Sequence, residues 1–158
     1  DIFQQHYQAI SQQKEVVSLV YDTQATQDDF AQIFTDARSK DLALKYTTKG
    51  IHRDDYTFAI GGYPLKKFGS QGQQKSFAVA LKLAQFDFMH QYSQQKPLLL
   101  MDDIFDKLDE QRIGSLLELL AAGHFGQVFI TDARPERSRN LMHNLPTEVK
   151  IFPLGEEA

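Results

Sequence analysis

Two short runs of this chain contain residues whose types and spacing could bind a nucleotide. The first is Ser70-Gln-Gly-Gln73, at the point where a long helix is predicted to begin. Backbone N–H groups at a helix start attract anions, and a glycine in the first turn would let a phosphate approach them closely. Because serine is also an ordinary helix N-cap, the run by itself favours a purely structural role over phosphate binding.

The second run, Leu98-Leu-Leu-Met-Asp-Asp103, is an apolar stretch that ends in two carboxylates. It lacks polar alternation, which predicts a strand covered on both faces, as in the middle of a parallel sheet. The carboxyl ends of such strands form the edge at which open α/β sheets bind ligands. Asp102 could hold Mg²⁺ through water, and Asp103 could orient or deprotonate an attacking water. Two acids at this position can also simply cap the following turn.

These runs and the stretches around them resemble the RecF family of bacterial recombinational repair proteins, within the wider ABC and SMC-type ATPases. The resemblance spans roughly residues 45–135 and is carried by Gly50-Ile-His-Arg-Asp-Asp55, Phe68-Gly-Ser-Gln-Gly-Gln-Gln-Lys75, Leu81-Lys-Leu-Ala84, Pro97-Leu-Leu-Leu-Met-Asp-Asp103, Asp106-Lys-Leu-Asp109 and Gln127-Val-Phe-Ile-Thr131. Transporter ATPases usually have Ser-Gly-Gly-Gln and Asp-Glu where this chain has Ser-Gln-Gly-Gln and Asp-Asp. The sequence is therefore more similar to the repair proteins.

The resemblance implies a nucleotide role for both runs. Ser70 and Gly72, with Gln71 and Gln73 beside them, would be the signature that binds the γ-phosphate of ATP held by the opposite subunit. Asp102 would be the Walker B aspartate, which holds Mg²⁺ through water. Asp103 would stand at the position of the catalytic acid.

Four further residues receive expected positions from the same resemblance. Asp106 and Asp109 would belong to the loop that crosses the dimer interface. Thr131 and Asp132 would occupy the switch region, where transporters place a histidine that this chain lacks.

The cluster His52-Arg53-Asp54-Asp55 resembles the Gly-Pro-His-Arg-Asp-Asp run of the family, with Ile51 in place of the proline. Two interpretations stay open. A histidine and an arginine beside two acids could satisfy one another in a local ion network, or His52 and Arg53 could lie at an interface or contact DNA.

The resemblance also implies cofactors and partners for the whole protein. It would use ATP and Mg²⁺, form a homodimer when ATP is bound, and bind DNA near single-strand gaps and single-strand to double-strand junctions. There it would help recombination mediator proteins to load recombinase. The sequence contains no Gly-x-x-x-x-Gly-Lys-Ser/Thr phosphate loop, so we place that element upstream of this chain. We expect the whole protein to be a slow ATPase, and this chain alone to be inactive and to bind ATP and Mg²⁺ weakly.

Two other functions remain open. A nucleotide-gated head of an SMC-type chromosome structural protein would predict long heptad coiled coils. A transporter ATPase subunit is the less favoured alternative, because Asp103 replaces the usual glutamate and the switch histidine is missing.

The elements expected to position these residues form an α/β fold. It would be the C-terminal half of an ABC-type ATPase head with a mostly parallel sheet, plus an N-terminal helical segment and a β-hairpin. We divide the chain into a helical hairpin over residues 1–41 and the head over residues 42–158. Periodicity and turn residues predict helices over 2–20, from Thr26 to about 37, 70–92, 109–122 and 135–143, and strands over 56–60, 63–67, 97–101, 128–131 and 149–152.

Composition sets the outer limits on function. The chain has 158 residues, 42% of them apolar, a net charge of −4 and no cysteine, which excludes disulfides and cysteine nucleophiles and fits a reducing cytoplasm. Its apolar runs are far shorter than the ~20 residues of a membrane span. We therefore expect a cytoplasmic protein without a membrane partner. A mildly acidic total does not exclude nucleic acid, because phosphate binding depends on local basic patches.

Overall fold

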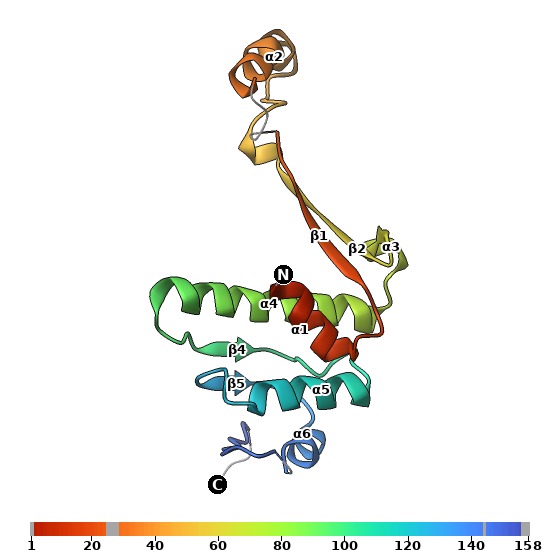
Figure 1. The fold of residues 1–158 in the computed structure, drawn as a ribbon, viewed down its shortest axis with the longest axis vertical. Coiled ribbons are helices and arrows are strands. Elements are labelled where there is room, and N and C mark those ends of the chain that lie inside the picture. The colour runs from red at the N-terminus through yellow and green to blue at the C-terminus, as the bar shows by residue number, and fades with distance from the viewer. Residues whose placement is uncertain (1, 25–28, 144, 156–158) are drawn as a thin grey trace.

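A long two-stranded ribbon separates a layered head from a distal tip, which consists of residues 30–53 (Figure 1). The computed structural model describes residues 2–24, 29–143 and 145–155. In chain order the elements are α1 (Ile2–Ser11), β1 (Val17–Asp22), α2 (Phe30–Leu44), the 3-10 turn η1 (Ile51–Arg53), β2 (Asp55–Ile60), β3 (Tyr63–Pro64), α3 (Leu65–Phe68), α4 (Gln71–Ser93), β4 (Leu99–Met101), α5 (Glu110–Ala121), β5 (Val128–Ile130) and α6 (Pro135–Met142).

The ribbon consists of β1 and β2, which pair antiparallel from Val17 opposite Ile60 to Asp22 opposite Asp55. β2 then turns into β3 through Gly61 and Gly62, whose φ angles of 55° and 82° suit a tight turn. The predicted hairpin is confirmed, but its second strand is short. The chain continues from Pro64 as the single helical turn α3 instead of extending to residue 67.

The predicted helix over residues 2–20 is wrong beyond Ser11. Gln12 and Gln13 adopt positive φ angles of 54° and 59°, which end α1, and the β-branched residues that follow form β1. The partner of β1 lies more than thirty residues later in the chain, where local periodicity cannot detect it. The predicted helical hairpin over residues 1–41 is therefore wrong, since a strand separates its two helices. The helix start predicted at Thr26 lies outside the described residues.

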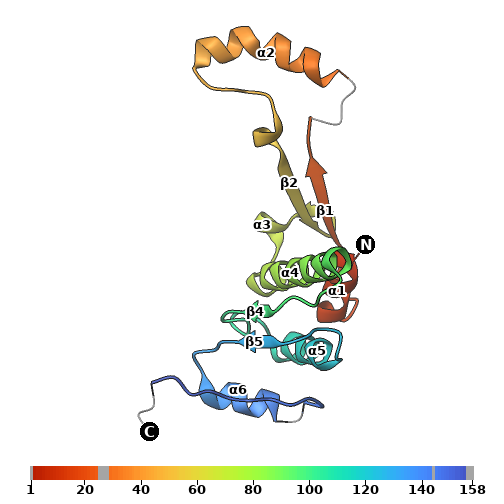
Figure 2. The ribbon, with the colours of Figure 1, turned by 90° about the vertical axis from the view of Figure 1, so that its left-hand side faces the viewer.

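The head is built in layers, which Figure 2 shows from the side as α1 with α4, then β4, β5 and α5, then α6. β4 and β5 pair in parallel, with Leu99 opposite Val128 and Met101 opposite Ile130, and α5 connects them as in a βαβ unit. α1 packs on α4 and α5, so residues 2–11 belong with the head. The α/β class and the parallel pairing of β4 and β5 are as expected.

Apolar side chains from three helices form the core of the head. Tyr7 and Ile10 of α1, Leu83 of α4, and Ile113 and Leu116 of α5 are fully buried. Burial of side chains of this size contributes about 1.5–3 kcal/mol each. This packing holds the opening turn of α4 and the end of β4 in fixed positions relative to each other.

Two strand predictions are corrected by the structure. Leu99 and Met101 are buried, but Leu98 and Leu100 are 62% and 59% exposed, so the described residues cover only one face of the small sheet. The strand predicted over residues 149–152 does not form in the described part of the chain. That segment is irregular, because no strand pairs with it there.

Candidate functional site

The two carboxylates that follow β4 lie beside the first residue after β5. The N–H of Thr131 donates to the carbonyl of Met101 at 3.0 Å, which extends the parallel pairing to the edge of the sheet. The Thr131 hydroxyl donates to Oδ1 of Asp102 and accepts from the backbone N–H of Asp103 at 3.2 Å. The structure thus brings together Asp102, Asp103 and Thr131, which were all predicted from the sequence.

Asp102 and Asp103 are exposed at this edge, so their carboxylates are open to solvent and ligands. The side chains around them present oxygen atoms, which are the ligands that Mg²⁺ prefers, and water can complete its coordination. Among the described residues, no three His, Asp or Glu side chains converge as direct cation ligands. The oxygen donors at this edge fit Mg²⁺ by type, and the role of Asp102 in holding it through water stays a prediction.

The loop after Asp103 is anchored by apolar side chains that point into the core. Ile104, Phe105 and Leu108 are buried, whereas Asp106 is half-buried with its carboxylate 3.8 Å from Nζ of Lys107. Asp106 also lies 4.0 Å from the guanidinium of Arg134. Anchoring of this kind displays the acids of the loop while their backbone stays fixed.

Ser70 is the N-cap of α4 and forms a complete capping box with Gln73. The Ser70 hydroxyl accepts from the Gln73 N–H at 3.2 Å, and the Gln73 side-chain oxygen accepts from the Ser70 N–H at 2.7 Å. Ser70 and Gln71 are both exposed. The helix-cap role is thus present in the structure. It leaves the N–H groups of Gln71 and Gly72, which have no partner inside the helix, available to an anion.

Gly72 has a structural role that the sequence did not suggest. A Cβ atom at this position would lie 3.0 Å from the carbonyl oxygen of Lys107, in the loop after β4. The Lys75 ammonium donates to the carbonyl of Asp103 at 3.0 Å and holds the same loop against α4. Close approach of this loop is therefore sufficient to explain the glycine, with or without a phosphate.

Asp109 is the N-cap of α5. Its Oδ1 accepts from the Arg112 N–H at 2.8 Å, and its Oδ2 lies 3.4 Å from Nε of Arg112. The Arg112 side chain continues to Glu15, in the connection between α1 and β1, at 2.8 Å. Glu15 and Arg112 were missed by the sequence reasoning, because no spacing or motif connects them.

Asp132 lies in the turn before α6, where its Oδ2 accepts from the Ser138 hydroxyl at 2.6 Å. Its Oδ1 is buried and lacks a hydrogen-bond partner among the described residues. Asp132 thus shapes the chain after Thr131, and among the described residues no hydrogen bond joins its carboxylate to Asp102.

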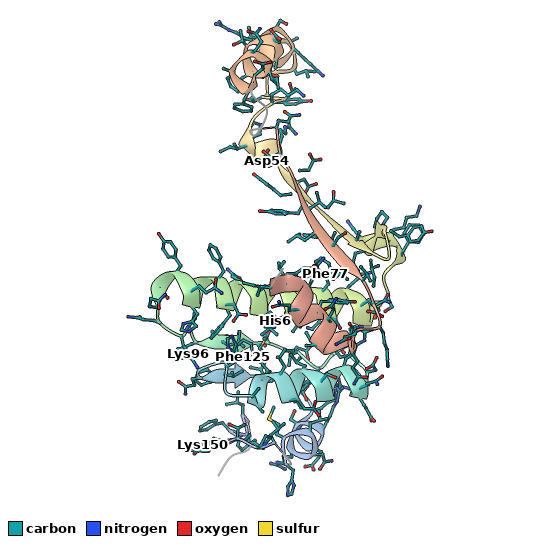
Figure 3. All side chains as sticks on the ribbon, in the orientation of Figure 1. His6, Asp54, Phe77, Lys96, Phe125 and Lys150 are labelled. Atoms are coloured by element: carbon teal, nitrogen blue, oxygen red, sulfur yellow. The ribbon has the colours of Figure 1, made fainter. Side chains whose placement is uncertain are left out.

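His52 and Arg53 lie far from these residues, in η1 next to Asp54 at the distal end of the ribbon (Figure 3). The His52 ring and the Arg53 guanidinium both bind the Thr47 carbonyl, at 3.1 and 3.0 Å. Asp54 is instead bound by the Tyr21 hydroxyl. Within the described residues neither basic side chain forms a salt bridge with the neighbouring acids, so the structure does not support the ion-network interpretation.

Several curated proteins similar to this chain have the name "DNA replication and repair protein RecF". The one from Flavobacterium johnsoniae is 49% identical over 97% of this chain and 43% of its own length. The one from Cytophaga hutchinsonii is 46% identical over 96% of this chain and 40% of its own length. The one from Bacteroides thetaiotaomicron is 44% identical over 98% of this chain and 42% of its own length. The chain thus spans about two fifths of the length of these relatives. No family model matches it.

Solved structures agree with the sequence relatives. The structure of the recombination mediator protein RecF-ATPrS in the RecFOR pathway matches with a TM-score of 0.66 and 25% identity, over 84% of this chain and 38% of that one. A structure of the same protein described as RecF-ATP gives the same TM-score at 24% identity.

Proposed function

Because this chain is RecF-related in sequence and fold over the part of RecF that it spans, we propose that it forms the signature and Walker B part of a RecF-type ATPase head. The observation that carries this proposal is the meeting of Asp102, Asp103 and Thr131 at the carboxyl edge of β4 and β5. It is supported by the exposed first turn of α4, which is packed against the loop that continues from the same edge.

In this proposal the first turn of α4 binds the γ-phosphate of an ATP molecule that the partner subunit holds. The N-terminus of a long helix carries a partial positive charge of about half a unit. α4 has 23 residues, and Ser70, Gln71 and the N–H groups of Gln71 and Gly72 lie at its exposed start. Each head would complete the other's site, so that ATP joins two copies into a homodimer.

Asp102 and Asp103 would act on the ATP of their own subunit. Asp102 would hold Mg²⁺ through water, with the Thr131 hydroxyl keeping one carboxylate oxygen oriented. Bound Mg²⁺ neutralises charge on the phosphate oxygens during phosphoryl transfer. Asp103 would orient the attacking water or accept its proton. Asp106 and Asp109 would lie on the loop that faces the partner subunit.

We propose that the ATP-bound homodimer acts on DNA in the cytoplasm, at single-strand gaps and junctions, where it helps mediator proteins to load recombinase. The names of the relatives, a replication and repair protein and a recombination mediator, support this proposal. The distal tip adds a physical reason. Residues 30–53 carry five Lys or Arg against two Asp, in a chain with a net charge of −4. His52 and Arg53 lie on this tip and are candidate contacts.

The SMC-type alternative is less well supported. It requires a coiled-coil arm, whereas the described arm is a two-stranded ribbon of six-residue strands that leads to one 15-residue helix.

Ser70→Arg tests the proposed function. The variant is made in a chimera in which this chain replaces the matching segment of the Flavobacterium johnsoniae protein, so that a complete head is present. We expect the parent chimera to dimerise when ATP and Mg²⁺ are added, and the variant to stay monomeric because the long cationic side chain blocks the phosphate. Light scattering coupled to size-exclusion chromatography measures both.

Ser93→Arg is the matched control, since it places the same side chain at the other, exposed end of α4. It should dimerise like the parent. If Ser70→Arg dimerises equally well, Ser70 is only a helix cap and the proposed role of the α4 start is wrong.

A further inference from the structure

A partly buried polar network next to the first turn of α4 joins segments that are distant in sequence. Its centre is Glu15, in the connection between α1 and β1. Oε1 of Glu15 accepts from the Gln73 side-chain amide at 2.8 Å and from the Arg112 guanidinium at 2.8 Å. Oε2 accepts from the Tyr7 hydroxyl at 2.5 Å. One carboxylate therefore binds α1, α4 and α5 at the same time.

The link from Glu15 to Ser70 runs through the Gln73 side chain. Its oxygen accepts from the Ser70 N–H and its nitrogen donates to Glu15. A carboxylate can only accept, so Glu15 determines which end of the Gln73 amide faces Ser70. Glu15 therefore orients the Gln73 side chain that completes the capping box at the start of α4.

The link from Glu15 to Asp109 runs through Arg112. The guanidinium donates to Glu15 and to the Ser76 hydroxyl at 3.0 Å, and its Nε lies 3.4 Å from Asp109. Arg112 is 15% exposed, whereas Asp109 is 64% exposed at the start of α5. A mostly buried cation with several partners therefore holds an acid that is itself on the surface.

The charges of the network are stably maintained. Burial raises the pKa of the Glu15 carboxyl, but hydrogen bonds from Tyr7, Gln73 and Arg112 lower it more, so that it lies below its ordinary value. Glu15 is only 17% exposed, and desolvation of such an ion pair offsets much of its attraction. The Glu15–Arg112 ion pair therefore contributes little net stability. Its main effect is to fix the relative positions of the segments that it joins.

We propose that Glu15 is a positioning residue that, through Gln73 and Arg112, holds the first turn of α4 and the Asp109 loop in one fixed relative geometry. The functional role of this positioning rests on the proposed function, in which both segments face the partner subunit in the ATP-bound dimer. Glu15 also lies just before β1, so the same carboxylate connects the dimer-facing surface to the base of the ribbon.

Glu15→Gln in the chimera tests the positioning directly, because the amide keeps the shape but removes the charge. The readout is hydrogen exchange in peptides that cover the Gln73 and Arg112 N–H groups, measured by mass spectrometry. We expect exchange there to become about tenfold faster, since hydrogen bonds to a charged group are strong enough to change a local opening equilibrium by that factor.

Asp87→Asn is the matched control. Asp87 is a carboxylate of similar burial, 13% exposed, that binds His6 and His124 on another part of the head. It should leave exchange at Gln73 and Arg112 unchanged. Equal acceleration at these two N–H groups in both variants would mean that Glu15 acts only through general stability, and the proposal would be wrong.

Gln73→Met keeps the result interpretable if Glu15→Gln folds poorly. It cuts the link to Ser70 but leaves the Glu15–Arg112 pair intact. Exchange should accelerate at Gln73 and not at Arg112. Acceleration at neither site would overturn the proposal.

The ATP concentration for half-maximal dimerisation is the second readout, and it separates this proposal from the proposed function. We expect an increase of at least about fivefold for Glu15→Gln, the lower range of coupling between sites. If Ser70→Arg abolishes dimerisation but Glu15→Gln leaves it unchanged, the function stands and the coupling is wrong. If the parent does not dimerise, the proposed function fails, and hydrogen exchange still decides whether Glu15 positions the two segments.

Discussion

Gly72 lies in the first turn of α4, where the carbonyl oxygen of Lys107 passes close enough to crowd any side chain. A Cβ atom would meet that oxygen at 3.0 Å, and the atom that would have to move belongs to the backbone. Glycine in a helix normally lowers stability by about 1 kcal/mol relative to alanine. At residue 72 the close packing of the loop against α4 favours glycine by more than the lower helix propensity of glycine disfavours it.

We therefore predict that Gly72→Ala destabilises the head by about 1–3 kcal/mol, the usual range for forcing extra atoms into a packed site. Urea unfolding of the chimera measures the change. Gly114→Ala is the control, since Gly114 lies inside α5 and nothing is within 4 Å of its added Cβ. The control should gain about 0.5–1 kcal/mol. A Gly72 variant as stable as the control would show that the loop yields easily.

The residues at element ends could be located from the sequence, while the network between elements could not. Ser70 and Asp102 stand next to local signals, a helix start and the end of an apolar run. Glu15, Gln73 and Arg112 are brought together by the packing of α1, α4 and α5. Their spacing in the sequence does not predict that contact, so it could be found only from the structure.

Among the elements, those whose determinants are local were predicted well. α4 and α5 have apolar periodicity, and each begins at a capping residue, Ser70 or Asp109. The helix prediction over the residues of β1 is wrong because this strand is stabilised mainly by pairing with β2. That partner is distant in sequence, so local periodicity does not detect it. The exposed face of β4 was unpredictable for a similar reason, since apolar residues alone do not say what covers them.

Asp87 of α4 connects three segments of the head. Its two oxygens bind the rings of His6 in α1 and His124 after α5, at 2.6 and 2.5 Å. Burial raises the pKa of the Asp87 carboxyl, but hydrogen bonds from His124 and His6 lower it more, so that it lies below its ordinary value of 3.8. The ionised carboxylate thus stabilises the folded state above pH 3.8, and this contribution is lost as the pH falls through the lower folded-state pKa.

We predict that the parent chimera exceeds Asp87→Asn in unfolding free energy by about 1.5–3 kcal/mol at pH 6, as expected for hydrogen bonds to a charged group. The difference should shrink below pH 3.8 and vanish once the pH has fallen below the lowered folded-state pKa of Asp87, where the carboxylate is protonated in both the folded and the unfolded state. Urea unfolding at a series of pH values measures it. Because other acids titrate in both proteins, they cancel. A difference that does not depend on pH would assign the effect to packing.

At the scale of the whole molecule, the ribbon holds two surfaces of different character apart. The head presents the acids after β4 and the start of α4, whereas the tip of residues 30–53 has an excess of three positive charges. Figure 1 shows that the ribbon keeps the tip well away from the sheet of the head. Such a separation would let the tip contact a phosphate backbone while the head engages ATP and the partner subunit, because screened charges act only over about 10 Å.

This arrangement predicts that DNA affinity and ATP-dependent dimerisation can be changed independently. Lys40→Ala with Lys49→Ala removes two tip cations, which should weaken DNA binding for all sequences and reduce the slope of log K against log salt by up to about 2. Fluorescence anisotropy with a gapped duplex at several salt concentrations measures this, while light scattering should show unchanged dimerisation. Lys96→Ala with Lys150→Ala removes the same charge from the head, where both residues are exposed (Figure 3). Because a general charge effect would weaken binding equally in both pairs, only a larger loss for the tip pair supports contact between the tip and DNA.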